Sequence, residues 1–200
     1  MKLLDQIEKF LKNKYTIFSL IGVVILIIAL NVYSYFKTEK NEAEFLRFVE
    51  INDAFASDIE SAKLSNELNL DFENFGYELI SKSVLAKKAL EEENFELAFS
   101  FYGELYSSLK DSGIDSGTKQ VLQEQFLENI LRLTMQLELY ESGKEYIENS
   151  NLNSVRFFEL AGDFYKYYEN YEIANEWYGK AIDSDITDAQ KNLIRLKLSN

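Results

Sequence analysis

The sequence predicts an all-α protein in which a single N-terminal membrane-spanning helix precedes a helical domain. The 200 residues include no proline and 8 glycines, so the usual turn residues of all-β folds are scarce. An unbroken stretch, Tyr15–Phe36, carries no formal charge, and later segments repeat apolar residues every three or four positions. These observations together predict an anchor followed by paired helices.

The uncharged stretch Tyr15–Phe36 has the length and the flanks of a transmembrane anchor. As a helix rising about 1.5 Å per residue it is about 33 Å long, enough for a hydrocarbon core of about 30 Å. Aromatic residues stand at both ends, where interfacial belts form, and Lys14 and Lys37 bracket the stretch. A cleaved signal peptide is the main alternative. The stretch is longer than an ordinary h-region, and no A-x-A-like site follows it, so we expect an uncleaved anchor.

Charge at the two flanks predicts the orientation of the anchor. Four lysines precede it, whereas Lys37, Lys40 and Arg47 follow it within a similar distance. This bias favours a cytoplasmic N-terminus. The expected order is a cytoplasmic tail over 1–14, the transmembrane anchor over 15–36 and a helical domain over 37–200, which an inner-membrane protein of a Gram-negative bacterium would hold in the periplasm.

The composition excludes several kinds of chemistry. Without histidine or cysteine the chain cannot form a Ser-His-Asp triad, a Cys-His nucleophile or a zinc site with those ligands. We therefore predict no catalytic residue, cofactor or metal. Paired carboxylates could still serve an acidic hydrolase, but nothing in their spacing marks such a pair.

The charge of the segment after the anchor bears on its partners. From Thr38 onward 32 acidic residues face 16 basic ones. A domain this acidic repels phosphate backbones, so nucleic acid is excluded as a partner and other proteins are favoured.

The helical domain is predicted to begin with a long helix over Glu42–Leu64, where apolar residues recur at helical spacing. That helix could continue directly from the anchor. A polar stretch, Ser65–Asn74, separates it from a region of weak internal repetition.

The clearest repeated unit is Val155–Asp185. Small residues at Gly162, Ala174 and Ala181 would let two antiparallel helices approach closely, while large aromatic residues fill the gaps beside them. This order of small and aromatic residues matches a tetratricopeptide repeat. The sequence thus predicts a tetratricopeptide-like α-solenoid of antiparallel helix pairs.

Two further units and a closing helix complete the predicted solenoid. Leu79–Lys110 repeats the pattern, whereas a degenerate unit from about Glu124 to Asn151 has Thr134 in place of the aromatic residue. The segment Gly113–Gly117 is expected to be the loop between them. A last helix, Thr187–Leu198, is expected to start at a Thr187 cap and to cover the open end of the stack. The residues expected to do so are Leu193, Ile194, Leu196 and Leu198.

In such a repeat the first helix of each pair lines a groove that binds partners. Spacings of three and four select one face of each first helix as the candidate groove. Glu159 and Asp163 would repel an acidic C-terminal peptide, so no carboxylate clamp is expected. The candidate groove residues are Ser83, Lys87, Gln125, Glu128, Arg132, Met135, Arg156, Glu159, Asp163, Lys166 and Tyr167.

The order of these parts resembles a known family. A short basic tail, one anchor, degenerate repeats and a closing helix after Ser184–Thr187 are similar to the YfgM-like ancillary subunits of the Sec translocon. The resemblance implies a non-enzymatic scaffold that contacts the SecYEG channel and a membrane-anchored periplasmic chaperone and assists exported proteins. Three alternatives remain: a coordinator of envelope assembly or cell division, a cytosol-facing membrane adaptor, and an acidic hydrolase.

Overall fold

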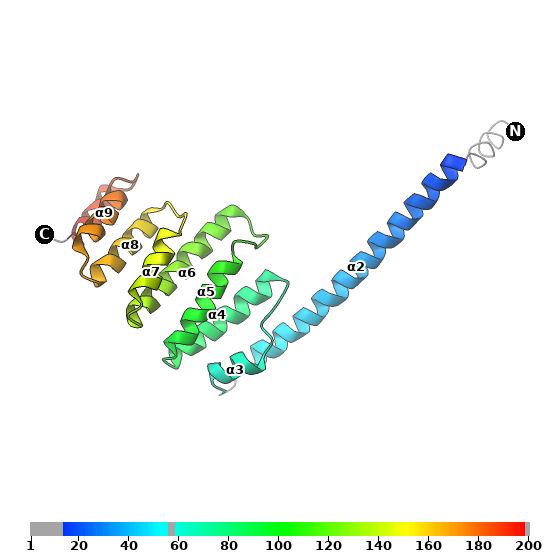
Figure 1. Ribbon diagram of the computed structural model, residues 1–200, viewed down its shortest axis with the longest axis horizontal. Coiled ribbons are helices and arrows are strands. Elements are labelled where there is room, and N and C mark those ends of the chain that lie inside the picture. The colour runs from blue at the N-terminus through cyan, green and yellow to red at the C-terminus, as the bar shows by residue number, and fades with distance from the viewer. Residues whose placement is uncertain (1–13, 56–58, 199–200) are drawn as a thin grey trace. The chain divides into compact units, whose positions relative to one another are not determined.

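The computed structural model describes residues 14–55 and 59–198, with side chains from residue 28 onward except at position 33 (Figure 1). Every regular element in these ranges is a helix, which confirms the predicted all-α class. The elements are α2 (Lys14–Phe55), α3 (Ser61–Glu67), α4 (Phe75–Glu91), α5 (Phe95–Ser108), α6 (Ser116–Gln136), α7 (Tyr140–Glu148), α8 (Val155–Tyr167), α9 (Tyr171–Ile182) and α10 (Asp188–Arg195).

The chain divides into two compact units, Met1–Val49 and Glu50–Asn200. The first contains most of α2. The structure does not describe the side chains of residues 15–27 and 33 in the predicted anchor, Tyr15–Phe36. Residues 1–13 of the predicted tail also lie outside the described part. Among the described residues, no helix is both long enough and apolar enough to cross a membrane. The anchor therefore stays a prediction.

The predicted single helix over Glu42–Leu64 is wrong in its continuity, because residues 59 and 60 are not helical and a separate helix, α3, begins at Ser61. The Ser61 N–H donates to both carboxylate oxygens of Glu92, at 3.1 and 2.9 Å, and the Ser61 hydroxyl donates to the same carboxylate. A carboxylate at the first turn satisfies N–H groups that an uninterrupted helix would use internally. The start of α3 therefore depends on a residue 31 positions away.

We expect the Glu92 cap to make the docking of α3 sensitive to acid. Desolvation acts to raise the pKa of Glu92, but the hydrogen bonds from Ser61 outweigh it and the pKa lies below its ordinary value. The stabilisation is thus complete above the ordinary glutamate pKa and is lost as the pH falls through the lowered value. The protection of the α3 amides against hydrogen exchange, relative to the unfolded chain at the same pH, should fall over that acidic range, and Glu92→Gln should remove this pH dependence. Equal pH dependence in both proteins would contradict the cap.

Three helix pairs, α4–α5, α6–α7 and α8–α9, follow α3, and α10 packs on α9 (Figure 1). The turn inside each pair is the same. Glu93, Glu138 and Glu169 have φ values of 59°, 57° and 60°, in the left-handed region. The N–H of the next residue then bonds to a carbonyl five positions earlier, as from Asn94 to Ala89 at 2.8 Å. This is the Schellman ending of a helix, repeated three times.

Glycine at these turns should stabilise the protein, because a left-handed conformation costs an L-residue about 1–2 kcal/mol and glycine nothing. Allowing for the greater freedom of glycine in the unfolded chain, Glu169→Gly should raise the free energy of unfolding by roughly 0.5–1 kcal/mol. Urea unfolding of the full chain in detergent measures it. Glu172→Gly, in the first turn of α9, is the control and should destabilise. A loss of stability in Glu169→Gly would contradict the inference that the left-handed backbone conformation of Glu169 is strained.

The small residues of the last unit pack as predicted. Gly162, Ala174 and Ala181 are buried, and a Cβ on Gly162 would lie 2.5 Å from the Tyr178 ring. The predicted start of the degenerate unit at Glu124 is wrong, because α6 begins at Ser116. There the Asp115 carboxylate accepts the Thr118 N–H at 3.0 Å, so Gly117 is helical rather than part of the loop.

The closing helix α10 begins at the predicted cap. Thr187 and Gln190 form a capping box, in which each side chain bonds the backbone N–H of the other residue. Its apolar face is narrower than predicted: Ile194 is 3 % exposed, whereas Leu193, Leu196 and Leu198 are 65 %, 81 % and 38 % exposed. Successive helix positions differ by about 100°, so a short helix that packs through Ile194 turns its neighbours outward.

Candidate partner-binding face

The candidate groove residues of the second and third pairs form two polar clusters on α6 and α8, and the clusters differ in charge. The side of α6 and α8 that carries these clusters is named the groove face. It is defined by Glu128, Arg132, Arg156, Glu159 and Asp163.

The first cluster centres on Glu128 of α6. Its carboxylate accepts a hydrogen bond of 2.8 Å from the guanidinium of Arg132, one turn along the same helix, and also forms an ion pair with Arg156 of α8. Partial burial acts to raise the pKa of Glu128, but hydrogen bonds from Arg156 and Arg132 outweigh it and hold that pKa below its ordinary value. The side chains of Arg132 and Arg156 both remain more than half exposed. This cluster therefore joins two helix pairs and presents free donor capacity to solvent.

The second cluster centres on Lys197, which follows α10. Its ammonium lies 2.6 Å from Glu159 Oε1 and 2.8 Å from Asp163 Oδ2. The buried Tyr178 hydroxyl donates to Asp163 Oδ1 at 2.7 Å, and Lys166 Nζ donates to the Lys197 carbonyl at 2.6 Å. Three predicted groove residues thus converge on a residue that the sequence did not predict. Only the position of Lys197 in the chain could have indicated this contact, because the segment after α10 comes back to α8.

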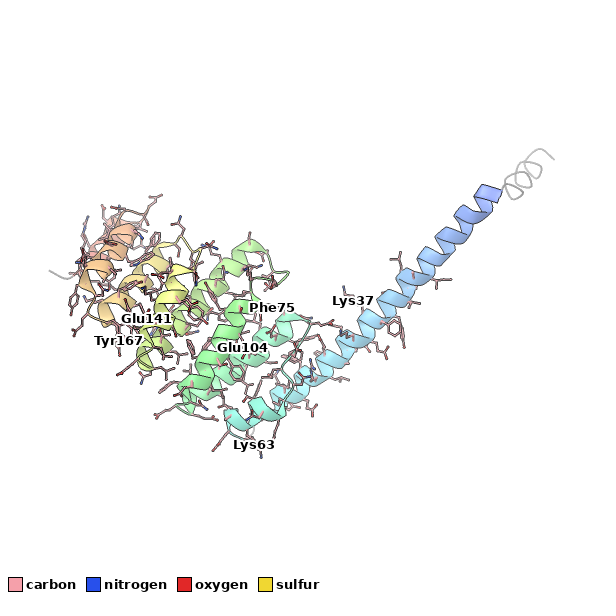
Figure 2. The ribbon with its side chains drawn as sticks, in the orientation of Figure 1. Lys37, Lys63, Phe75, Glu104, Glu141 and Tyr167 are labelled. Atoms are coloured by element: carbon pink, nitrogen blue, oxygen red, sulfur yellow. The ribbon has the colours of Figure 1, made fainter. Side chains whose placement is uncertain are left out.

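The remaining candidate residues are more scattered. Gln125 is exposed on α6, while Met135 is half-buried and packs against the core of the last two pairs. Tyr167, at the end of α8, is 56 % exposed (Figure 2). Ser83 and Lys87 lie on α4, and within the described chain no ion pair or hydrogen bond joins them to the clusters on α6 and α8. Lys87 pairs instead with Glu91 on its own helix.

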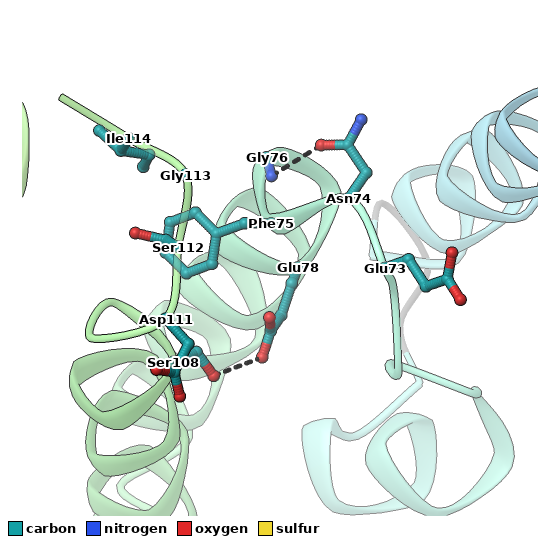
Figure 3. Close-up of a pocket in the computed structure, with 10 residues that line it drawn as sticks. All are labelled: Glu73, Asn74, Phe75, Gly76, Glu78, Ser108, Asp111, Ser112, Gly113 and Ile114. Carbon is teal, nitrogen blue, oxygen red and sulfur yellow. Dashed lines mark hydrogen bonds between the residues drawn. The ribbon is translucent and has the colours of Figure 1, made fainter. Parts of the chain in front are cut away.

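Two cavities that the sequence did not predict lie beside the first helix pair. The larger, about 620 Å³, lies between the start of α4 and the segment after α5 (Figure 3). On its wall the Ser108 hydroxyl donates to Glu78 at 2.9 Å. The second, about 480 Å³, is lined in part by Lys82 and Glu104. Lys82 bonds both Glu78 and Glu104 at 2.8 Å, so the walls of the two cavities share one ionic network across α4 and α5.

The described carboxyl groups bear on the acidic-hydrolase alternative. No group of three or more acidic residues among them is arranged to hold a metal ion. The described carboxyl groups with clearly shifted pKa values, Glu92, Asp115 and Glu128, all shift below the ordinary range. A general acid needs a carboxyl pKa raised toward neutrality, which is the opposite direction.

Comparison with known proteins identifies the fold family. A family profile described as a tetratricopeptide repeat-like domain matches residues 10–200. No curated protein and no solved structure shows a significant match to the sequence. The match spans the three helix pairs, α10 and nearly all of the preceding chain. The chain belongs to the tetratricopeptide repeat-like domain family.

Proposed function

We propose that the protein is a membrane-anchored scaffold that binds a segment of another protein along the groove face. The observation that supports this most directly is the Glu128–Arg156 ion pair, which joins the first helices of two successive pairs into one surface. Exposed guanidinium groups and the exposed Tyr167 ring on these helices are residue types that recur at the energetic centres of protein interfaces. Family membership points to the same class of function.

Within this class, we propose an accessory of the Sec translocon and of a membrane-anchored periplasmic chaperone. Three sequence features support it: the uncharged stretch Tyr15–Phe36, the lysines before it and the resemblance to the YfgM-like subunits. On this proposal the N-terminus is cytoplasmic, the anchor lies in the inner membrane and the repeat domain is periplasmic. The role is to hold partners together rather than to catalyse a reaction.

Site-specific photocrosslinking in cells tests the scaffold. A photoreactive residue at position 132 or 167 should capture SecYEG or chaperone subunits, whereas one at Glu176, exposed on the second helix α9, should not. Capture of other proteins only would overturn the export role and favour an envelope or division coordinator. Equal capture from all three positions would overturn the groove face as the binding surface.

A fusion after Asn200 tests the topology. A reporter that is active only in the periplasm should be active there, while a cytoplasmic reporter should be silent. The reverse pattern would overturn the periplasmic placement and support the cytosol-facing adaptor.

A further inference from the structure

The Lys197 cluster has the geometry of an occupied binding site. The ammonium of a lysine has three donor hydrogens, and here three carboxylate oxygens surround it: Glu159 Oε1 at 2.6 Å and Asp163 Oδ2 and Oδ1 at 2.8 and 3.0 Å. Lys166 contacts the backbone as well, because its ammonium donates to the Lys197 carbonyl. Side chains of α8 therefore contact both the side chain and the main chain of Lys197, which lies in the turn that follows α10.

The acceptor side of this site is held in place independently of Lys197. Tyr178 is fully buried at the crossing of α8 and α9, and its hydroxyl orients the Asp163 carboxylate. Glu159 and Asp163 lie one turn apart on α8, so their spacing is set by the helix. The site should thus persist when its occupant leaves.

The occupant, in contrast, lies outside the regular helix. Lys197 lies beyond the end of α10, and its neighbour Leu196 is 81 % exposed. Ile194 is buried and packs α10 on the stack at a position before residues 196–198. The Lys197 side chain is 34 % exposed, so solvent partly screens its ion pairs. Release of residues 196–198 from the groove face would therefore leave the buried Ile194 contact of α10 in place.

We propose that residues 196–198 are an internal ligand of the groove face, and that a partner enters by placing its own lysine between Glu159 and Asp163. The excess of acidic over basic residues from Thr38 onward also favours a lysine-bearing partner. This inference rests on the proposed scaffold function and adds to it the chemistry of the partner segment.

A peptide that copies the occupant tests the proposal. The probe is fluorescein-labelled Asn-Leu-Ile-Arg-Leu-Lys-Leu, the sequence of residues 192–198, titrated against the full chain in detergent micelles. If the internal ligand is bound about nine-tenths of the time, Lys197→Gln should bind the probe about tenfold more tightly than the wild type. Asp163→Asn in the Lys197→Gln background should lose that gain. Circular dichroism checks that each variant is folded.

Two controls separate this mechanism from a general effect of charge. Arg195→Gln removes the same charge from α10, where the guanidinium donates to Asn192, and it should bind the probe like the wild type. A probe with glutamine at its lysine should bind neither protein. Equal binding by the wild type and Lys197→Gln, or equal binding of both probes, would overturn the internal ligand. Crosslinking from position 132 would still succeed in that case, leaving the scaffold function intact.

Discussion

Gly143→Ala should destabilise the repeat domain even though alanine is the better helix former. A Cβ at this position would lie 2.3 Å from Phe164 Cε2 and 2.8 Å from Thr134 Oγ1. Phe164 is fully buried and stacks on Tyr140 at 5.8 Å, so its ring has no space to move away. Overpacking costs about 1–3 kcal/mol, against a gain of about 1 kcal/mol in helix propensity. The single tryptophan, Trp177, reports unfolding in urea.

The matched control is Gly179→Ala in α9, where a new Cβ would meet no atom within 4 Å. Because only the helix propensity changes here, the free energy of unfolding of this variant should rise by about 0.5–1 kcal/mol. If Gly143→Ala gains a similar amount, the close approach of α7 to Phe164 is not a constraint on the fold.

The last unit and the degenerate unit differ in how much of their packing the sequence could predict. In the last unit the alternation of small and aromatic residues is complete, and α8 and α9 follow it. In the degenerate unit, Thr134 replaces the aromatic residue, yet it is fully buried and its hydroxyl donates to Leu131 at 2.8 Å. Phe164 of the following pair approaches the same place, because a Cβ on Gly143 would meet both its ring and Thr134 Oγ1. Local pattern cannot reveal a neighbour that arrives from another repeat.

The other differences have the same physical origin. The break before α3 depends on Glu92, and the outward turn of Leu193 and Leu196 depends on how α10 docks through Ile194. Each is a tertiary contact rather than a local preference. Caps made within four residues, such as Thr187 with Gln190, could be predicted from the sequence.

The candidate site divides in the same way. The helical spacing in the sequence predicted Glu128, Arg132 and Arg156 as groove residues, and the structure brings them together. Which cation would meet Glu159 and Asp163 could not be predicted from spacing, because Lys197 lies 34 residues beyond Asp163.

Lys82→Met should destabilise the repeat domain far more than removal of an exposed lysine charge does. Lys82 and Glu78 have side chains only 12 % and 14 % exposed, and Lys82 also bonds Glu104. Desolvation acts to lower the pKa of Lys82, but its bonds to Glu104 and Glu78 outweigh this and raise that pKa. Removing the ammonium leaves Glu78 as a poorly solvated charge, which we expect to cost about 2–4 kcal/mol.

A double-mutant cycle identifies the cause of that loss. Glu78→Gln removes the charge but keeps an acceptor for the Ser108 hydroxyl, so the double variant Glu78→Gln/Lys82→Met should be more stable than Lys82→Met alone. Lys87→Met, at an exposed position of the same helix, should change stability by less than about 0.5 kcal/mol. In alkali the wild type should lose this contribution as the pH rises through the raised lysine pKa, whereas Lys82→Met should not. Equal losses in Lys82→Met and Lys87→Met, measured by circular dichroism in urea, would show that the network does not join α4 to α5 energetically.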